Sequence, residues 1–70
     1  MFYVIEFQTN AGTGSVIPFT FSSRNEAEAK YHDILKYASV SSVDKHGAMI
    51  FTEDGFILKS EIYNHVDNAE

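Results

Sequence analysis

The stretch SRNEAEAKYHDILKYAS, Ser23 to Ser39, carries the clearest structural signal in the chain and decides the fold. It opens with a capping box, in which the Ser23 hydroxyl can accept from the Glu26 amide while the Glu26 carboxylate returns to the Ser23 amide. Glu26 and Glu28 place negative charge near the positive end of the helix dipole. The pattern predicts a helix over about residues 24–39.

One face of this helix is apolar along its whole length. Its apolar residues follow one another at spacings of 4, 3, 1 and 3, which is the period of a helix. They are Ala27, Tyr31, Ile34, Leu35 and Ala38. A helix with one apolar stripe has to bury it against another element, and the rest of the chain is typical of strands.

Two strands are predicted before the helix. The segment FYVIEFQ, about residues 2–8, is rich in β-branched and aromatic residues and leads into a glycine-containing loop. The segment SVIPFTF, about residues 15–21, follows as the second strand of a hairpin. Pro18 has no amide hydrogen to donate to a sheet, so this strand is expected at a sheet edge or with a bulge.

Two further strands are predicted after the helix, over about residues 46–52 and 56–63. The sequence between them, Glu53 to Gly55, is a hairpin turn signal. The order of elements is therefore β-β-α-β-β. We expect one α+β domain, residues 1–70, in which the helix packs on one face of a four-stranded, mainly antiparallel sheet.

A single helix covers only one face of such a sheet, so the other face should be polar in an isolated domain. Strand alternation instead predicts many apolar side chains there. The predicted members of this uncovered face are Phe2, Val4, Val16, Met49, Phe51, Ile57 and Tyr63. Exposed apolar patches mark interfaces, so these residues predict a homodimer or a dedicated protein partner. The alternative is that the loops and the C-terminal tail fold over that face.

Composition and charge narrow the classes of partner. Ten acidic residues against five basic ones give a net charge of −5. The bases are spread along the chain, which argues against nucleic-acid binding through phosphates. No apolar run approaches the roughly 18 residues of a membrane helix, and the N-terminus lacks the basic segment of a signal peptide. The chain has no cysteine, which fits a reducing compartment, and we expect a cytoplasmic protein without a membrane partner.

No residue pattern predicts catalysis or a cofactor. The three histidines, His32, His46 and His65, lack zinc-binding spacing, although the last two could lie at the same end of the sheet. Ordinary hydrogen bonds are the expected role of these rings. No two carboxylates are forced into an apolar cleft, and there is no nucleophile elbow or phosphate loop. We therefore expect no enzyme, no metal and no cofactor.

The stretch from Glu26 to His65 includes the segments EAEAKYHDIL, SVSSVDKHGAMIF and DGFILKSEIYNH. It resembles small uncharacterised proteins encoded by phages and prophages of Firmicute-type bacteria. The resemblance is one of general pattern and carries over no functional residue. It implies an accessory protein of a mobile element, and some small acidic phage proteins inhibit host defence by covering a basic surface of their target.

Two functions follow as expectations. The first is a small acidic interaction module that binds a host or phage protein, with inhibition of host defence as one role. The second is a self-associating structural or assembly component of a phage particle, in which the uncovered sheet face joins neighbouring subunits. Both depend on the sheet face that the helix leaves uncovered.

Overall fold

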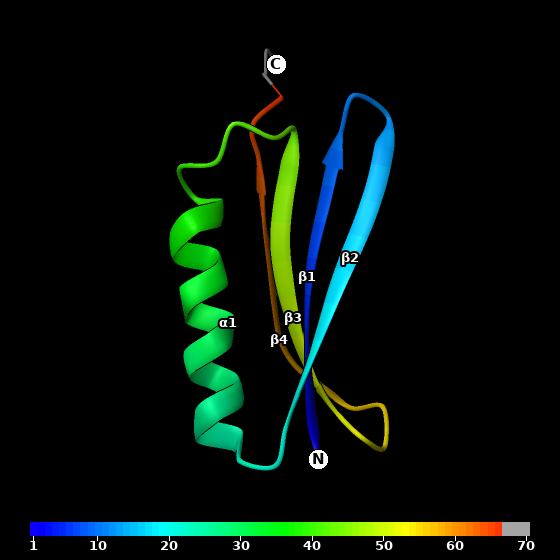
Figure 1. Cartoon of the computed structure of the whole chain (residues 1–70), viewed down its shortest axis with the longest axis vertical. Helices are drawn as coiled ribbons and strands as arrows, with labels where there is room; N and C mark the ends of the chain where they lie inside the picture. Colours follow the sequence, from blue (N-terminus) through cyan, green and yellow to red (C-terminus); the bar gives the residue numbers. More distant parts are fainter. Residues whose placement is uncertain (67–70) are drawn as a thin grey trace.

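A computed structural model describes residues 1–66 of the chain. The end of the predicted C-terminal tail, residues 67–70, lies outside the described residues. The elements are β1 (Phe2–Asn10), β2 (Thr13–Phe21), α1 (Arg24–Ala38), β3 (Lys45–Thr52) and β4 (Ile57–Asn64). The strands form one antiparallel sheet in the order β2-β1-β3-β4, with α1 along one of its faces (Figure 1). The predicted α+β fold is confirmed.

Helix α1 begins where the sequence predicts. The Ser23 hydroxyl accepts a hydrogen bond from the Glu26 amide at 3.4 Å, so Ser23 is the N-cap. The helix ends at Ala38, and Ser39 is its C-cap. The buried residues of the helix are Ala27, Tyr31, Ile34 and Ala38. The predicted apolar stripe is therefore confirmed as the face that meets the sheet.

The core lies between α1 and the two central strands, β1 and β3. Val4 and Ile50 lie opposite each other on these strands and are fully buried, and Ala48 is buried beside them. Partly buried side chains surround this centre, namely Phe2, Phe19, Phe21, Leu35 and Leu58. Full burial of a Val or Ile side chain contributes about 1.5–3 kcal/mol, so a few residues supply much of the stability of so short a chain.

Strand β2 is an edge strand, as Pro18 predicts. In the sheet it is hydrogen-bonded to β1, and Pro18 lies opposite Ile5. A residue without an amide hydrogen is tolerated at an edge because one side of the strand needs no partner. Strand β4 forms the other edge, where a register shift beside Ile50 and Phe51 leaves Leu58 outside the paired register.

The hairpin that joins β1 and β2 is tighter than the predicted loop. Its strands pair as far as Asn10 and Thr13, so only Ala11 and Gly12 form the turn. Both turn residues have positive φ angles, 53° for Ala11 and 83° for Gly12. Asp44 holds this turn, since its carboxylate accepts a hydrogen bond from the Ala11 amide at 3.0 Å. Two-residue turns of this kind match the twist of the strands, which lets the pairing run to the tip.

We expect Ala11→Asn to raise the free energy of unfolding by about 0.5–1 kcal/mol, because Asn tolerates a positive φ better than Ala and Asn-Gly is the preferred pair in such turns. The change keeps the backbone amide that Asp44 binds. Urea unfolding followed by circular dichroism measures the effect. Ala11→Val is the opposing control and should lower stability, since a β-branched residue is strained at this angle. Equal midpoints for all three proteins would contradict the described turn.

Three residues predicted for the uncovered face lie on the helix side of the sheet, so the prediction was wrong for them. Phe2 and Val4 pack in the core beneath α1. Tyr63 lies opposite the buried His46, which places it on the same side. Strand β1 is apolar on both faces, so alternation alone could not tell which one meets the helix. In β4 the register shift resets the alternation, and Tyr63 therefore falls on the opposite face from Ile57.

Candidate protein interface on the open sheet face

The face of the sheet that α1 does not cover is called the open face. Side chains alternate along a strand, so this face is made by the sequence neighbours of the core residues Val4, Ala48 and Ile50. Its apolar members are Tyr3, Ile5, Phe7, Val16, Pro18, Met49, Phe51, Ile57 and Ile62. They come from all four strands and therefore form a continuous surface across the sheet.

Large apolar side chains of the open face reach the solvent. Val16 is 64% exposed, Ile57 is 61% exposed and Ile62 is 47% exposed. The rings of Tyr3 and Phe51 contact each other, with 5.3 Å between their centroids. At the strand positions of this face within residues 1–66, one charged side chain occurs, Lys45 near one end. The open face is thus an apolar, almost uncharged surface on an acidic protein.

The described loops leave the open face uncovered. In Figure 1 the connections between the elements lie at the ends of the sheet rather than across it. The high exposure of Val16 and Ile57, on the two edge strands, agrees with this arrangement. The alternative prediction, that the C-terminal tail folds over this face, concerns mainly residues 67–70, which lie outside the described residues.

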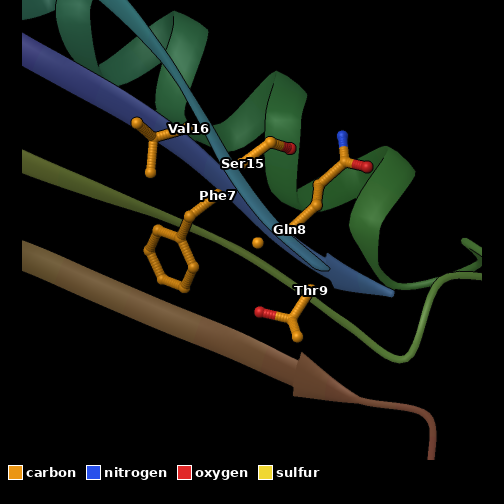
Figure 2. A pocket seen from close by; sticks show the side chains of 6 residues that line it. Phe7, Gln8, Thr9, Ser15 and Val16 are labelled. Atoms are coloured by element: carbon orange, nitrogen blue, oxygen red, sulfur yellow. The ribbon is translucent and has the colours of Figure 1, made fainter. Parts of the chain in front are cut away.

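Phe7 stands between two hollows of the open face. The first, of about 370 Å³, lies toward β2 and is lined by Phe7, Gln8, Thr9, Gly14, Ser15 and Val16. The second, of about 330 Å³, lies toward β4 and is lined by Phe7, Met49, Ser60, Glu61 and Ile62. Gly14 helps to form the first hollow, because it lines that hollow and presents no side chain on this face. Figure 2 shows the Phe7 ring on the open side of the sheet and the Gln8 side chain on the side of α1.

Gly47 allows the Phe7 ring to lie against the backbone of the sheet. A Cβ atom at Gly47 would lie 3.0 Å from the Phe7 ring and 2.9 Å from the Cα of Ile62. It would also collide with the carbonyl oxygen of Glu61. The aromatic ring covers the glycine on the neighbouring strand, an arrangement that also occurs in other sheets, and it separates the two hollows.

Sequence reasoning found part of the open face. The predicted residues that lie on it are Val16, Met49, Phe51 and Ile57. The large apolar residues that it missed are Tyr3, Ile5, Phe7 and Ile62, which were not among the residues predicted for the uncovered face. Ala48 and Ile50 identify the side of β3 that faces the helix. No feature of the β1 sequence shows which of its two faces lies on the same side of the sheet as these residues.

The helix side of the sheet carries a buried polar pair. His46 is 6% exposed, and its Nε2 lies 2.7 Å from the Oε2 of Glu6. A carboxylate oxygen accepts, so Nε2 is the donor in this bond. The Gln8 side-chain amide donates to the same carboxylate oxygen at 3.3 Å. The His46 Nδ1 atom is buried and has no hydrogen-bond partner within the described part of the chain.

The other two histidines have separate surroundings. His65 lies at the same end of the sheet as His46, and its Nε2 lies 2.8 Å from the carbonyl oxygen of Ala38. His32 is exposed on α1, with its ring edge-on to Tyr31 at 5.3 Å. Within residues 1–66, no three acidic or histidine side chains are grouped so that they could hold a metal ion. The geometry therefore gives these rings roles in local contacts.

Two side chains at α1 have displaced pKa values. Burial raises the pKa of Tyr31, and the nearby Glu61 carboxylate adds to the rise. Hydrogen bonds from Arg24 and Lys59, with N–O distances of 2.8 Å and 3.3 Å, lower the pKa of Glu28. The contact between Lys59 and Glu28 ties β4 to the helix. The Tyr31 shift arises mainly from burial, and the Glu28 shift arises first from Arg24 within α1 and then from Lys59 on β4.

Comparison with known proteins identifies no relative. No protein-family model, no curated protein and no solved structure matches the chain. In the part of the chain that the structure describes, no helix is both long enough and apolar enough to cross a membrane. The functional argument therefore rests on the surface of the molecule, and the open face is its most distinctive part.

Proposed function

We propose that this chain is a protein-interaction module that binds its partner through the open face. The observation that supports this most is the exposure of large apolar side chains, such as Val16, Ile57 and Ile62, on one continuous surface. Full burial of a fully exposed Val or Ile side chain contributes about 1.5–3 kcal/mol, and these partly exposed side chains each contribute a share of that when a partner surface covers them. Tyr, Phe and Met, which this face contains, are enriched in protein interfaces.

The chemistry of the open face favours a protein as the partner. A net charge of −5 opposes binding to phosphate backbones, and the face has no basic groove. The two hollows beside Phe7 lie on the outside of the sheet, where they fit projecting side chains of a partner better than an enclosed small molecule. The partner that we propose presents an apolar patch of similar extent, and no catalytic step is part of the function.

The resemblance to phage and prophage proteins supplies a biological setting for the proposal. In that setting the chain is an accessory protein of a mobile element, acts in the cytoplasm of the host and holds a host or phage protein. Inhibition of a host-defence protein is one role that such binding could serve. This setting stays a prediction that rests on the resemblance.

Met49→Lys tests the proposal, because Met49 lies in the middle of the open face between Ile5 and Ser60. A long lysine side chain can keep its stem on the surface and its charge in water, so the fold should survive. The charge must be desolvated when a partner covers the face, and we expect at least a tenfold loss of affinity. Affinity capture from a bacterial host extract, followed by titration of the captured protein, measures this loss.

Tyr37→Lys is the matched control for that experiment. Tyr37 is 59% exposed and lies on α1, away from the open face, so Tyr37→Lys places the same new charge on a different surface of the molecule. We expect it to bind like the wild-type protein. Circular dichroism confirms that both variants are folded. Equal capture of the same proteins by the wild type and by both variants would refute binding through the open face.

A second candidate function is self-assembly as a structural component of a particle. The observation that favours it is the near absence of charge on the open face, which removes the repulsion between two acidic copies at the point of contact. In this role the same face joins subunits instead of holding a different protein. The two functions share one surface and differ in its occupant.

A further inference from the structure

We infer that a second copy of this chain occupies the open face, in a symmetric dimer whose two sheets pack face to face. The inference rests on the proposed function, since it takes the open face to be the binding surface and names the occupant. It is carried by three observations on this face: the placement of charge, the extent of the surface and the shape around Phe7.

The placement of charge suits contact between identical copies. In a two-fold interface the same patch meets itself, so any cluster of like charge on the patch is set against its own copy. The chain carries ten acidic and five basic residues, yet the strand positions of the open face within residues 1–66 hold only Lys45. Lys45 lies near the end of β3, where its charge can stay in water. Two molecules of net charge −5 can therefore approach through this face without opposing carboxylates.

The extent of the open face is sufficient for a dimer interface at the lower end of the size range. Its strands contain 8 or 9 residues, and there are four of them side by side. At about 3.3 Å per residue and about 4.8 Å between strands, the flat area of the face is about 500 Å², and the projecting side chains add to this area. Two such faces bury about 1,000 Å² or more in total, which meets the lower threshold of about 1,000 Å² for a biological interface.

The shape around Phe7 is complementary to itself. The half-buried Phe7 ring lies over Gly47 near the middle of the open face, and a hollow lies on each side of it, about 370 Å³ toward β2 and about 330 Å³ toward β4. A two-fold axis that passes close to Phe7 sets the ring of each copy against a hollow of the other copy. Each molecule then supplies both a ring and a recess, as a symmetric interface requires.

The resulting dimer has four layers, helix, sheet, sheet and helix. Sheets that pack in this way lie about 10 Å apart with their strands within about 30° of each other. The charged outer surfaces of the two α1 helices then face the solvent. The arrangement buries the open-face residues that one chain leaves exposed, among them Val16 and Ile62.

The mass of the untagged protein in solution is the first test. Sedimentation velocity and light scattering across micromolar to millimolar concentrations should give twice the 7.9 kDa of one chain. Isotope-filtered nuclear Overhauser spectra of a mixed labelled and unlabelled sample should show contacts between the Phe7 ring of one copy and open-face methyl groups of the other. A mass of 7.9 kDa throughout, or intermolecular contacts from α1 instead, overturns the inference.

Two variants test the open face itself. Phe7→Ala removes the aromatic ring, and Met49→Lys places a charge in the middle of the contact; each should raise the dissociation constant of the dimer at least tenfold. Tyr37→Ala, which truncates an exposed aromatic on α1, should leave the dissociation constant unchanged. If Phe7→Ala does not fold, Met49→Lys decides. A dimer that Met49→Lys does not weaken forms through another surface and overturns the inference.

The outcomes separate this inference from the proposed function. A strict monomer that captures a different protein, and loses it in Met49→Lys, overturns the dimer and leaves the interaction module in place. A strict monomer whose captured proteins are unaffected by Met49→Lys removes both. A dimer that Met49→Lys dissociates supports the second copy as the occupant of the open face.

Discussion

Gly47→Ala is expected to lower the free energy of unfolding by about 3 kcal/mol or more, out of the roughly 4–10 kcal/mol typical of a chain of this length. A Cβ atom at this position collides with the Glu61 carbonyl oxygen and lies 2.9 Å from the Cα of Ile62. Both are backbone atoms of the paired strand, so relief requires β3 and β4 to separate. Urea unfolding followed by circular dichroism measures the loss.

Gly14→Ala is the matched control for this prediction. Gly14 also faces the open side, but its added Cβ would meet only the Gln8 carbonyl oxygen and the Thr9 hydroxyl, each at 3.9 Å. Alanine restricts the unfolded chain more than glycine does, so we expect no loss of stability, or a gain of about 0.5 kcal/mol. If Gly47→Ala unfolded at the same urea concentration as Gly14→Ala, the close approach of β4 to Gly47 would be disproved.

Glu6→Ala is expected to lower the free energy of unfolding by about 2–4 kcal/mol. In the described structure Glu6 is the hydrogen-bond partner of the His46 ring, so its removal leaves a buried polar group unpaired. The Gln8 amide loses its acceptor in the same change. The measurement is again the free energy of unfolding in urea.

Two further variants isolate the hydrogen bond from the packing. Glu6→Gln keeps an oxygen that can accept from His46, so it should cost clearly less than Glu6→Ala, about 1–2 kcal/mol. The double change Glu6→Leu with His46→Leu removes both polar groups from the interior and should cost less than Glu6→Ala alone. Equal losses for Glu6→Gln and Glu6→Ala would show that the bond between Glu6 and His46 contributes nothing.

Local signals predicted the architecture well. The helix could be predicted from the capping residue Ser23 and from the apolar spacing between Ala27 and Ala38. Both signals depend only on residues that are close in the sequence. Pro18 predicted an edge or a bulge for an equally local reason, the missing amide hydrogen, and the sheet order shows that β2 is an edge strand. The turn at Ala11 was predicted too long, since nothing in its sequence reveals the hydrogen bond from its amide to Asp44.

The candidate site was predicted less completely because it depends on long-range register. Strand β1 carries Val4 on one face and Ile5 on the other, and the polar Glu6 and Gln8 on the Val4 face made that face resemble the outer one. The choice is made by pairing, which sets Val4 beside Ile50 under the helix. In β4, the register shift near Leu58 reverses the alternation within a single strand, and no pattern in that segment marks it. The existence of an uncovered apolar face could thus be predicted, but only part of its membership.

The position of β1 in the sheet has a consequence for the order in which the molecule assembles. This strand comes first in the sequence but lies inside the sheet, and its second edge is completed only when Phe2 pairs with Thr52. The hydrogen bonds of the first hairpin and the helix join residues close in sequence, whereas the pairing of β1 with β3 joins distant segments, so we expect that pairing to be the slow step of folding. During synthesis, one edge of β1 therefore stays unpaired until β3 (Lys45–Thr52) has been made, and in that interval the edge is open to pairing with another molecule.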